Sequence, residues 1–197
     1  GDAAHLMPPF MGQGMCAGIR DASNLAWKIS LCIKNKHDGK FLDTYQTERF
    51  SNVKEYIETT MRMGEFVNAV GSENITDNIS SGPDGTKSMQ SIKPKLGIGL
   101  GSNKDKNRGK TFPQLKMKNG KTLDEKFSQS LLLLTSSKLT KKFSLNKIKS
   151  ITDKDIKGLG NLLKSYKAKA IIVRPDRFIL KTFKSVNDFN RINYLPL

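Results

Sequence analysis

The opening of the chain holds its most distinctive arrangement of residue types. Asp2 supplies a carboxylate, Pro8-Pro9 a rigid corner, and Gly12 and Gly14 flank a turn that leads into a helix. A carboxylate beside a strand end can accept hydrogen bonds from ligand hydroxyls, such as those of a sugar or a ribitol chain. Glycines have no side chain, so the backbone can approach a flat ring or a phosphate closely. The pattern is therefore that of a ligand-contacting turn.

The backbone N–H groups that follow this turn strengthen the same interpretation. Those of Gly14, Met15 and Cys16 stand at the start of the helix that we expect next, where N–H groups lack intrahelical acceptors. They lie at the positive end of the helix dipole, which suits an anion or a ring edge that becomes negative when it is reduced. The alternative is a glycine-rich connection in which Asp2 caps a turn, and the residues alone leave both readings open.

Charge divides the chain into two unlike halves. The 197 residues carry a formal net charge of +16; residues 1–100 have 11 Lys and Arg against 11 Asp and Glu, and residues 101–197 have 23 against 7. The whole excess therefore lies in the second half, where it is either a solvated lysine-rich surface or a face that binds polyanions. No run of eighteen apolar residues occurs, so no membrane-spanning helix and no membrane partner are expected.

Two cysteines are spaced too far apart for a metal or redox motif. Cys16 and Cys32 have no CxxC arrangement and no nearby histidine partner, so no metal site is expected. Nothing in the sequence addresses the chain for export. Reduced thiols and a cytoplasmic location are therefore the expectation.

Two helices follow the opening loop. Residues 17–34 have apolar side chains at helical spacing, at Ile19, Ala22, Leu25, Ala26, Ile29 and Ile33. A second, longer helix is predicted over 41–70. The charges around Arg49 in this second helix are placed to pair with the first helix, so Arg49 is predicted to be an internal tie. Trp27 is predicted to pack in the core.

The rest of the chain predicts a linker and a small α/β domain. Residues 71–109 are rich in Gly, Ser, Asn and Pro, and predict a linker plus a surface loop. Beyond them, strands are predicted over 110–117, 127–135, 168–174 and 178–183, weakly helical stretches over 139–150 and 153–166, and a short helix over 186–192. This order is typical of a thioredoxin-like domain, but without a CxxC it has no redox exchange to perform.

The same residues resemble a known family. The runs Gly1-Asp2-Ala3-Ala4-His5, Pro8-Pro9, Gly12-Gln13-Gly14-Met15, Gly18-Ile19-Arg20-Asp21-Ala22 and Asn24-Leu25-Ala26-Trp27-Lys28 are similar to the second flavin-contacting motif of class A FAD-dependent aromatic monooxygenases. The similarity extends through Leu42 to Arg49. Phe112-Pro113-Gln114 and Arg174-Pro175-Asp176-Arg177-Phe178 resemble pieces of the thioredoxin-like C-terminal domain of the phenol-hydroxylase type. The 3-(3-hydroxyphenyl)propionate hydroxylases are the most similar branch.

The resemblance implies a cofactor and roles for six residues. Asp2 would bond a ribityl hydroxyl of FAD, and Pro9 would lie beside the reacting edge of the isoalloxazine on the substrate side. Gly12, Gly14, Met15 and Cys16 would wrap the pyrimidine end through backbone N–H groups. In the family NAD(P)H reduces FAD, and an FAD C4a-hydroperoxide hydroxylates a phenolic substrate, with no catalytic protein side chain and no metal. Asn is common in the superfamily at the place of Cys16, so the contact expected there is one of the backbone.

The resemblance also implies what the chain lacks. A Gly-x-Gly-x-x-Gly unit for the ADP portion of FAD is absent, so a C-terminal fragment, inactive alone, is expected. The expected fold class is α/β, with the helical end of an FAD-binding, Rossmann-like domain at 1–70, a linker at 71–109 and a thioredoxin-like domain at 110–197. Expected partners are a small aromatic substrate and the missing N-terminal FAD-binding region, with a second copy of the chain left open, but not nucleic acid. The alternatives are a non-catalytic basic module for polyanions and a structural dimerisation domain.

Overall fold

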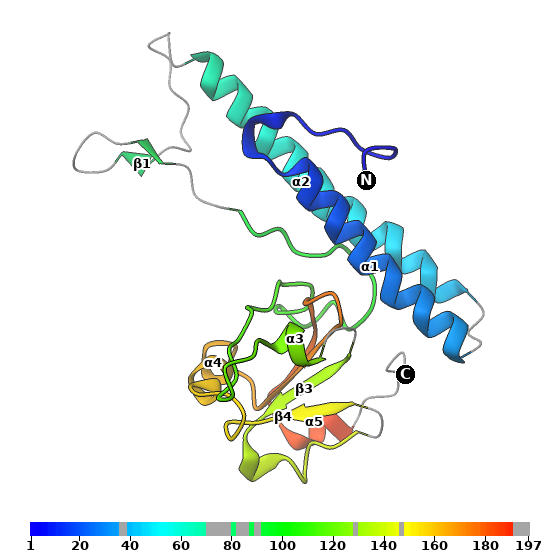
Figure 1. Cartoon of the computed structure of the whole chain (residues 1–197), viewed down its shortest axis with the longest axis vertical. Helices are drawn as coiled ribbons and strands as arrows, with labels where there is room; N and C mark the ends of the chain where they lie inside the picture. Colours follow the sequence, from blue (N-terminus) through cyan, green and yellow to red (C-terminus); the bar gives the residue numbers. More distant parts are fainter. Residues whose placement is uncertain are drawn as a thin grey trace.

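The computed structural model consists of a long helical hairpin joined to a small α/β unit (Figure 1). It describes residues 1–35, 39–69, 80–81, 87–88, 92–127, 130–145 and 148–190. Within the predicted linker 71–109, residues 71–79, 82–86 and 89–91 lie outside the described residues, as do residues 191–192 of the predicted helix 186–192. Within them, β1 (Ser80–Ser81) and β2 (Lys87–Ser88) form a two-stranded antiparallel pair.

Both predicted helices are present, with slightly shifted ends. A short 3-10 helix, η1 (Pro9–Met11), precedes α1 (Gly14–Asn35), and α2 (Lys40–Ala69) lies alongside α1 (Figure 1). The predicted tie through Arg49 is confirmed, because its Nε lies 2.7 Å from Oδ1 of Asp21 in α1. Trp27 is buried, as predicted, and meets the ring of Phe41 edge-on at 5.5 Å between centroids.

The α/β unit contains a four-stranded sheet in the order β4-β3-β5-β6. The strands are β3 (Leu132–Thr135), β4 (Lys149–Ile151), β5 (Ala170–Val173) and β6 (Ile179–Phe183). β3 and β4 run parallel, whereas β5 is antiparallel to both β3 and β6. Two parallel strands followed by an antiparallel hairpin form a thioredoxin-like sheet, and the α/β fold class is confirmed, although β4 was not among the predicted strands.

Side chains along each strand point alternately to the two faces of this sheet, and a separate apolar core covers each face. On one face, Leu133 and Ile172 pack with Phe183 and with Trp27 and Phe41 of the helical hairpin. On the other face, a second cluster gathers the remaining inward-facing strand residues and the apolar residues of α3 (Leu123–Phe127) and α4 (Leu159–Ser165). The helical hairpin therefore shares a core with the sheet. A last helix, α5 (Val186–Asn190), follows β6.

Two local predictions were wrong and several elements, α3 and β4 among them, were not foreseen. Residues 110–117 form no continuous strand, and only the isolated bridges Thr111–Phe178 and Lys116–Thr122 are present. Pro113 explains this, because it has no N–H to donate to a ladder. The stretch 139–150 is not helical in its described part; it contains the end of η2 (Ser137–Leu139), turns, and most of β4. Helix α3 lies in a stretch for which no helix was predicted.

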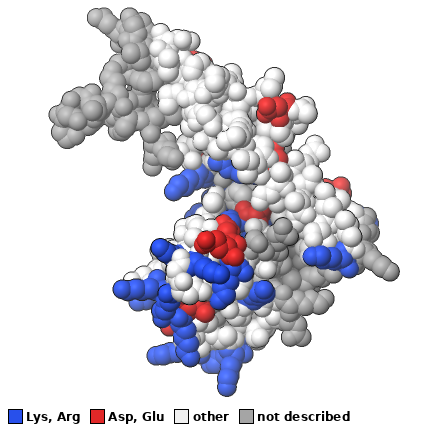
Figure 2. All heavy atoms as spheres, in the orientation of Figure 1, with Lys and Arg blue, Asp and Glu red and all other residues white. Residues whose placement is uncertain are grey.

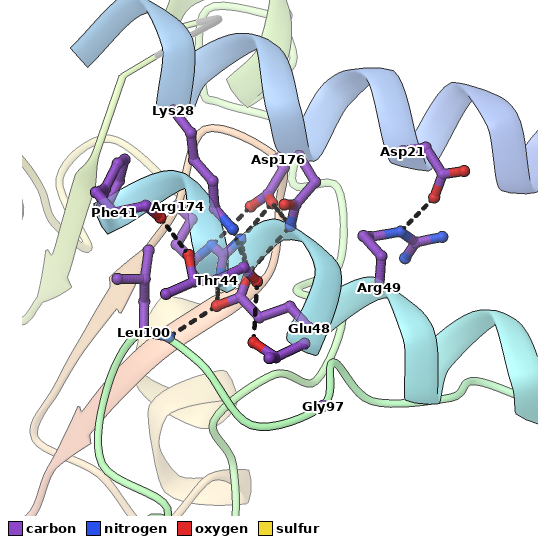
Figure 3. A network of polar contacts seen from close by, with 12 residues as sticks. Asp21, Lys28, Phe41, Thr44, Glu48, Arg49, Gly97, Leu100, Arg174 and Asp176 are labelled. Atoms are coloured by element: carbon purple, nitrogen blue, oxygen red, sulfur yellow. Dashed lines mark hydrogen bonds and ion pairs between the residues drawn. The ribbon is translucent and has the colours of Figure 1, made fainter. Parts of the chain in front are cut away.

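A buried cluster of charges joins the helical hairpin to the sheet (Figure 3). Arg174, at the end of β5, donates from both terminal nitrogens to the carboxylate of Glu48 in α2, at 2.8 Å each. Its Nη2 and Nε also donate to Asp176, at 2.6 and 3.0 Å. Lys28 of α1 donates to Glu48 at 2.9 Å, and Asn24 bridges Glu48 and Asp176. Two cations and two anions thus balance in a site closed to solvent.

The segment around Gly97 and Gly99, which precedes the sheet in the chain, packs its backbone directly against α2. A Cβ on Gly97 would lie 2.3 Å from the carbonyl oxygen of Thr47, and one on Gly99 would lie 2.3 Å from Cγ of Glu48. This closeness lets the N–H of Leu100 donate to Oε1 of Glu48 at 2.8 Å. The Gly-x-Gly pattern here therefore serves close backbone packing.

The two cations of the cluster are expected to contribute unequally to stability. Burial lowers the pKa of Lys28 to about 8 despite its contact with Glu48, whereas for Arg174 the two carboxylates outweigh burial and raise the pKa. Arg174→Met should cost about 3–5 kcal/mol, because it strands two buried carboxylates. Lys28→Met should cost only about 1–2 kcal/mol, because Glu48 keeps its other donors. Urea unfolding followed through the fluorescence of Trp27 measures the free energy of unfolding of both variants. Equal losses for the two would contradict the prediction. Lys54→Met, at an exposed lysine, is the control.

The close glycine contact gives a second prediction. Gly99→Ala should destabilise the fold by about 1–3 kcal/mol, because its Cβ would displace the Glu48 side chain that holds Arg174. The matched control is Gly160→Ala in α4, where a Cβ meets nothing within 4 Å. That change should stabilise the protein by about 0.5–1 kcal/mol through helix propensity. Thermal unfolding distinguishes the two signs, and a neutral Gly99→Ala would contradict the packing role.

Candidate functional site

The opening loop folds into two successive turns before α1 begins. The N–H groups of Ala4 and His5 donate to the carbonyl of Gly1 at 2.8 and 3.1 Å. After η1, Gly12 adopts a φ of 59°, in the left-handed region that favours glycine, and its N–H donates to the carbonyl of Pro9 at 3.0 Å. This turn directs the chain into α1 at Gly14.

Asp21, on the second turn of α1, anchors the start of the loop. Its Oδ2 accepts hydrogen bonds from the amino group of Gly1 at 2.8 Å and from Nε2 of His5 at 2.7 Å, while Arg49 binds Oδ1 (Figure 3). Burial alone would raise the pKa of Asp21, but these hydrogen bonds and the charge of Arg49 lower it to about 2. The carboxylate of Asp21, ionised at neutral pH, therefore ties the loop through His5 to α1, and through Arg49 to α2.

The remainder of the loop is held against α2. A Cβ on Gly64 would lie 2.5 Å from the ring of Phe10, so the ring of Phe10 occupies the space that a side chain there would need. Gln13 accepts a hydrogen bond from Arg20 at 3.1 Å, and the guanidinium of Arg20 stacks 4.7 Å from the ring centroid of Tyr56. The turn at Gly12 is thereby fixed from both sides.

The six residues predicted to contact a cofactor all lie on the open side of this loop or at its junction with α1. Asp2, Pro9, Gly12 and Met15 are exposed, and Gly14 and Cys16 are half-buried. Gly1 comes within 3.8 Å of the Cβ position of Gly18, which brings Asp2 beside the first turns of α1. The structure thus brings the Asp2 end of the loop near the helix start, although these residues are up to fourteen positions apart.

The space around the glycine turn suits a close ligand. A Cβ on Gly12 or on Gly14 would meet nothing within 4 Å, so the backbone there is accessible. The carbonyl of Gln13 accepts the first helical bond, from Ala17 at 2.8 Å, which leaves the N–H groups of Gly14, Met15 and Cys16 ahead of it without a helical acceptor. The arrangement offers backbone donors and one free carboxylate, but no nucleophile–base pair.

The described part of the chain contains neither a candidate metal site nor a membrane-spanning helix. No group of three His, Cys, Asp or Glu residues there could hold a metal ion, and Cys16 and Cys32 are free thiols. No helix among the described residues has the length and apolar character needed to cross a membrane.

Sequence reasoning missed the residues that orient α1 beneath the site. Asp21, Asn24 and Lys28 are buried and point toward α2, yet none was given a role. Their spacing of three and four residues puts three polar side chains on one face of a helix, and this was the available signal.

Comparisons with known proteins agree with this geometry. Residues 1–60 match the family described as "FAD binding domain". Over 64 residues, the chain is 52% identical to a probable NADH-specific resorcinol 4-hydroxylase of Rhodococcus jostii and 50% identical to a 3-(3-hydroxy-phenyl)propionate/3-hydroxycinnamic acid hydroxylase of Escherichia coli. Each match covers 32% of this chain and 12% of the relative, so the matched part spans about an eighth of those proteins.

Solved structures extend the likeness to nearly the whole fold. Aklavinone-11 hydroxylase with FAD and aklavinone superposes with a TM-score of 0.60 at 16% identity, covering 94% of this chain and 39% of that one. The flavin-dependent monooxygenase PieE, with FAD and substrate, gives 0.59 at 15% identity, covering 95% and 44%. At such identities the likeness concerns the fold alone.

Residues 1–60 are thus similar in sequence to an FAD binding domain, and the fold of almost the whole chain is similar to that of FAD-dependent monooxygenases.

Proposed function

We propose that this chain forms part of an enzyme that hydroxylates a phenolic substrate with FAD, NAD(P)H and O2. The observation that carries the proposal is the accessible glycine turn at Gly12 and Gly14, which opens directly onto the start of α1. Support also comes from the matched relatives, whose names are those of a resorcinol and a 3-hydroxyphenylpropionate hydroxylase, the first of them NADH-specific.

The residues of the loop fit FAD at its ribityl and pyrimidine ends. Asp2 is exposed and can accept a hydrogen bond from a ribityl hydroxyl. The turn at Gly12 and Gly14 has room for a flat ring beside the backbone, and the N–H groups of Met15 and Cys16 can donate to a ring carbonyl. Each of these contacts uses an atom that the fold leaves available.

Charge stabilisation would come from the helix that these residues begin. The N-terminus of α1 carries a partial positive charge, which favours negative charge on the pyrimidine end of a reduced flavin. Pro9 in η1 would border the substrate side. FAD, when bound, supplies the oxygen-activating chemistry. The protein's part is to hold and orient the ring system.

We also propose that the chain has three parts. Residues 1–70 would be the end of an FAD-binding domain, 71–109 a connecting segment, and 110–197 a thioredoxin-like domain. The family match over 1–60 and the sheet formed between Leu132 and Phe183 support the outer two. The described end of the connecting segment, 92–109, packs on α2 and on β6, since Gly97 bonds Glu48 and Gly109 bonds Ile179.

A basic binding module is the second candidate. Lys and Arg side chains are spread over the α/β unit in the view of Figure 2, with acidic side chains among them. This mixture is typical of a solvated surface. The comparisons favour the flavoprotein over this alternative. Nucleic-acid binding that persists at physiological salt would support the basic module, and its absence at low salt would exclude it.

The proposed flavin contacts can be tested in two steps. The purified chain alone is titrated with FAD, and binding is followed by flavin fluorescence. No tight stoichiometric binding is expected, because the chain has no Gly-x-Gly-x-x-Gly unit to hold the ADP portion of FAD. A chimera of the Escherichia coli hydroxylase that carries residues 1–60 of this chain in place of its own matching segment should retain FAD. In that chimera Asp2→Ala should weaken FAD binding about tenfold to a hundredfold, the loss expected for one charge-assisted hydrogen bond.

The control is Asp43→Ala, which removes the same charge from an exposed position on α2. It should leave FAD affinity unchanged. Tight FAD binding by the chain alone would contradict the proposal that the opening loop supplies only part of the flavin site. A folded chimera that is purified without FAD would contradict the flavin role of the loop.

A further inference from the structure

The middle of α1 is held by the end of β5 and by the turn that follows it. Asn24 of α1 donates to Asp176 at 2.9 Å, a contact between residues 152 positions apart. The guanidinium of Arg174 lies 5.0 Å from the ring centroid of Trp27, three residues further along α1. Both of these α1 side chains are buried. The α/β unit therefore contacts α1 directly as well as through α2.

Arg174 holds in place the acceptors to which α1 binds. Its Nη2 donates to Oε2 of Glu48 and to Oδ2 of Asp176, at 2.8 and 2.6 Å. Nδ2 of Asn24 donates to the same two oxygens, at 3.2 and 2.9 Å. Without Arg174, two buried carboxylates would repel each other, while Lys28 supplies one positive charge against their two negative ones. Their separation would withdraw the acceptors of Asn24.

The position of α1 at Asn24 determines where its first turn points. α1 is one continuous helix, and at about 1.5 Å per residue its first turn lies about 13 Å along the axis from Asn24. A second buried contact, between Asp21 and Arg49, holds the helix one turn closer to the opening loop. A rigid rod held at two points keeps its tilt, whereas a rod held at one point can swing about it. Loss of the Asn24 contact should therefore displace the first turn.

We propose that Arg174 is a positioning residue for this first turn: by holding both carboxylates that bind Asn24, it sets the direction of the N–H groups of residues 14–16. Arg174 directly follows β5, so it acts on the turn through α1. The part of the inference that concerns FAD rests on the proposed function. If these N–H groups bind the flavin, the α/β unit contributes to FAD affinity, although all six predicted contacts lie within residues 2–16.

Cys16, in the first turn of α1, reports on this position in the chain itself and without FAD. Its thiol is free and half-buried. In a Cys32→Ser background, alkylation of Cys16 under native conditions is followed by mass spectrometry. Arg174→Met should raise the alkylation rate at least about tenfold, because a helix end that has lost a fixed point opens more often.

Arg174→Lys keeps the test decisive if Arg174→Met does not fold. It retains the positive charge, but a lysine ammonium cannot bridge two carboxylates with the planar fork of a guanidinium. The alkylation rate should rise in the same direction by a smaller factor. An unchanged rate in both variants, or in Arg174→Lys where Arg174→Met does not fold, would overturn the proposal.

The matched control is Leu163→Ala in α4. Leu163 is buried in the core on the other face of the sheet, to which α1 contributes none of the described residues. Its truncation lowers the stability of the whole fold without touching α1. The alkylation rate of Cys16 should stay nearly unchanged. Equal acceleration by Leu163→Ala and by the Arg174 variants would mean that labelling follows global unfolding, and this would also overturn the proposal.

FAD binding is measured separately, in a chimera that joins residues 1–197 to the region of the Escherichia coli hydroxylase preceding its matching segment. There Arg174→Met should weaken FAD binding about tenfold, and Leu163→Ala should leave it unchanged. If the unsubstituted chimera holds no FAD while Cys16 responds as expected, the flavin function fails and the positioning role stands. If the chimera holds FAD but the Arg174 variants change neither FAD affinity nor Cys16 alkylation, the positioning role fails and the flavin function stands.

Discussion

The carboxylate of Glu48 is the point on which the arrangement of the chain depends. It is buried, and it accepts hydrogen bonds from Arg174 of the sheet, Lys28 and Asn24 of α1, and the N–H of Leu100. The two guanidinium contacts and the Lys28 ammonium hold the pKa of Glu48 at about 2, although burial alone would raise it. One ionised side chain in α2 thus holds together α1, α2, the segment at Leu100 and the end of β5.

The polar interior of the hairpin decides what remains on its surface. Because α1 turns Asp21, Asn24 and Lys28 toward α2, its isoleucines have to face outward. A helix with this pattern in an isolated protein would normally be buried the other way round. The same Asp21–Arg49 pair also holds the opening loop against the two helices.

Much of this could be read from the sequence, and the exceptions have physical causes. Helical periodicity located α1 and α2 to within a few residues, and apolar runs located β3 and β5. The same periodicity could not tell which face of α1 is covered, because the answer lies in Arg174 and Asp176, at the far end of the chain. The expected strand over 110–117 failed at Pro113, and β4 was hidden in a lysine-rich stretch whose composition gives no strand signal.

The two motifs that resemble the family at opposite ends of the chain turn out to meet in one place. The Asn24 and Lys28 pair belongs to the motif that follows the opening loop, and Arg174 and Asp176 belong to the Arg-Pro-Asp motif of the sheet. Arg174 also lies 5.0 Å from the ring of Trp27, so the sheet fixes the middle of α1 by both charge and stacking. Asp21 and Arg49 fix the helix one to two turns closer to the loop. The rotation of α1, and with it the direction of the N–H groups at Gly14 to Cys16, is therefore set in part by the sheet, which gives the α/β unit a role in positioning the opening loop.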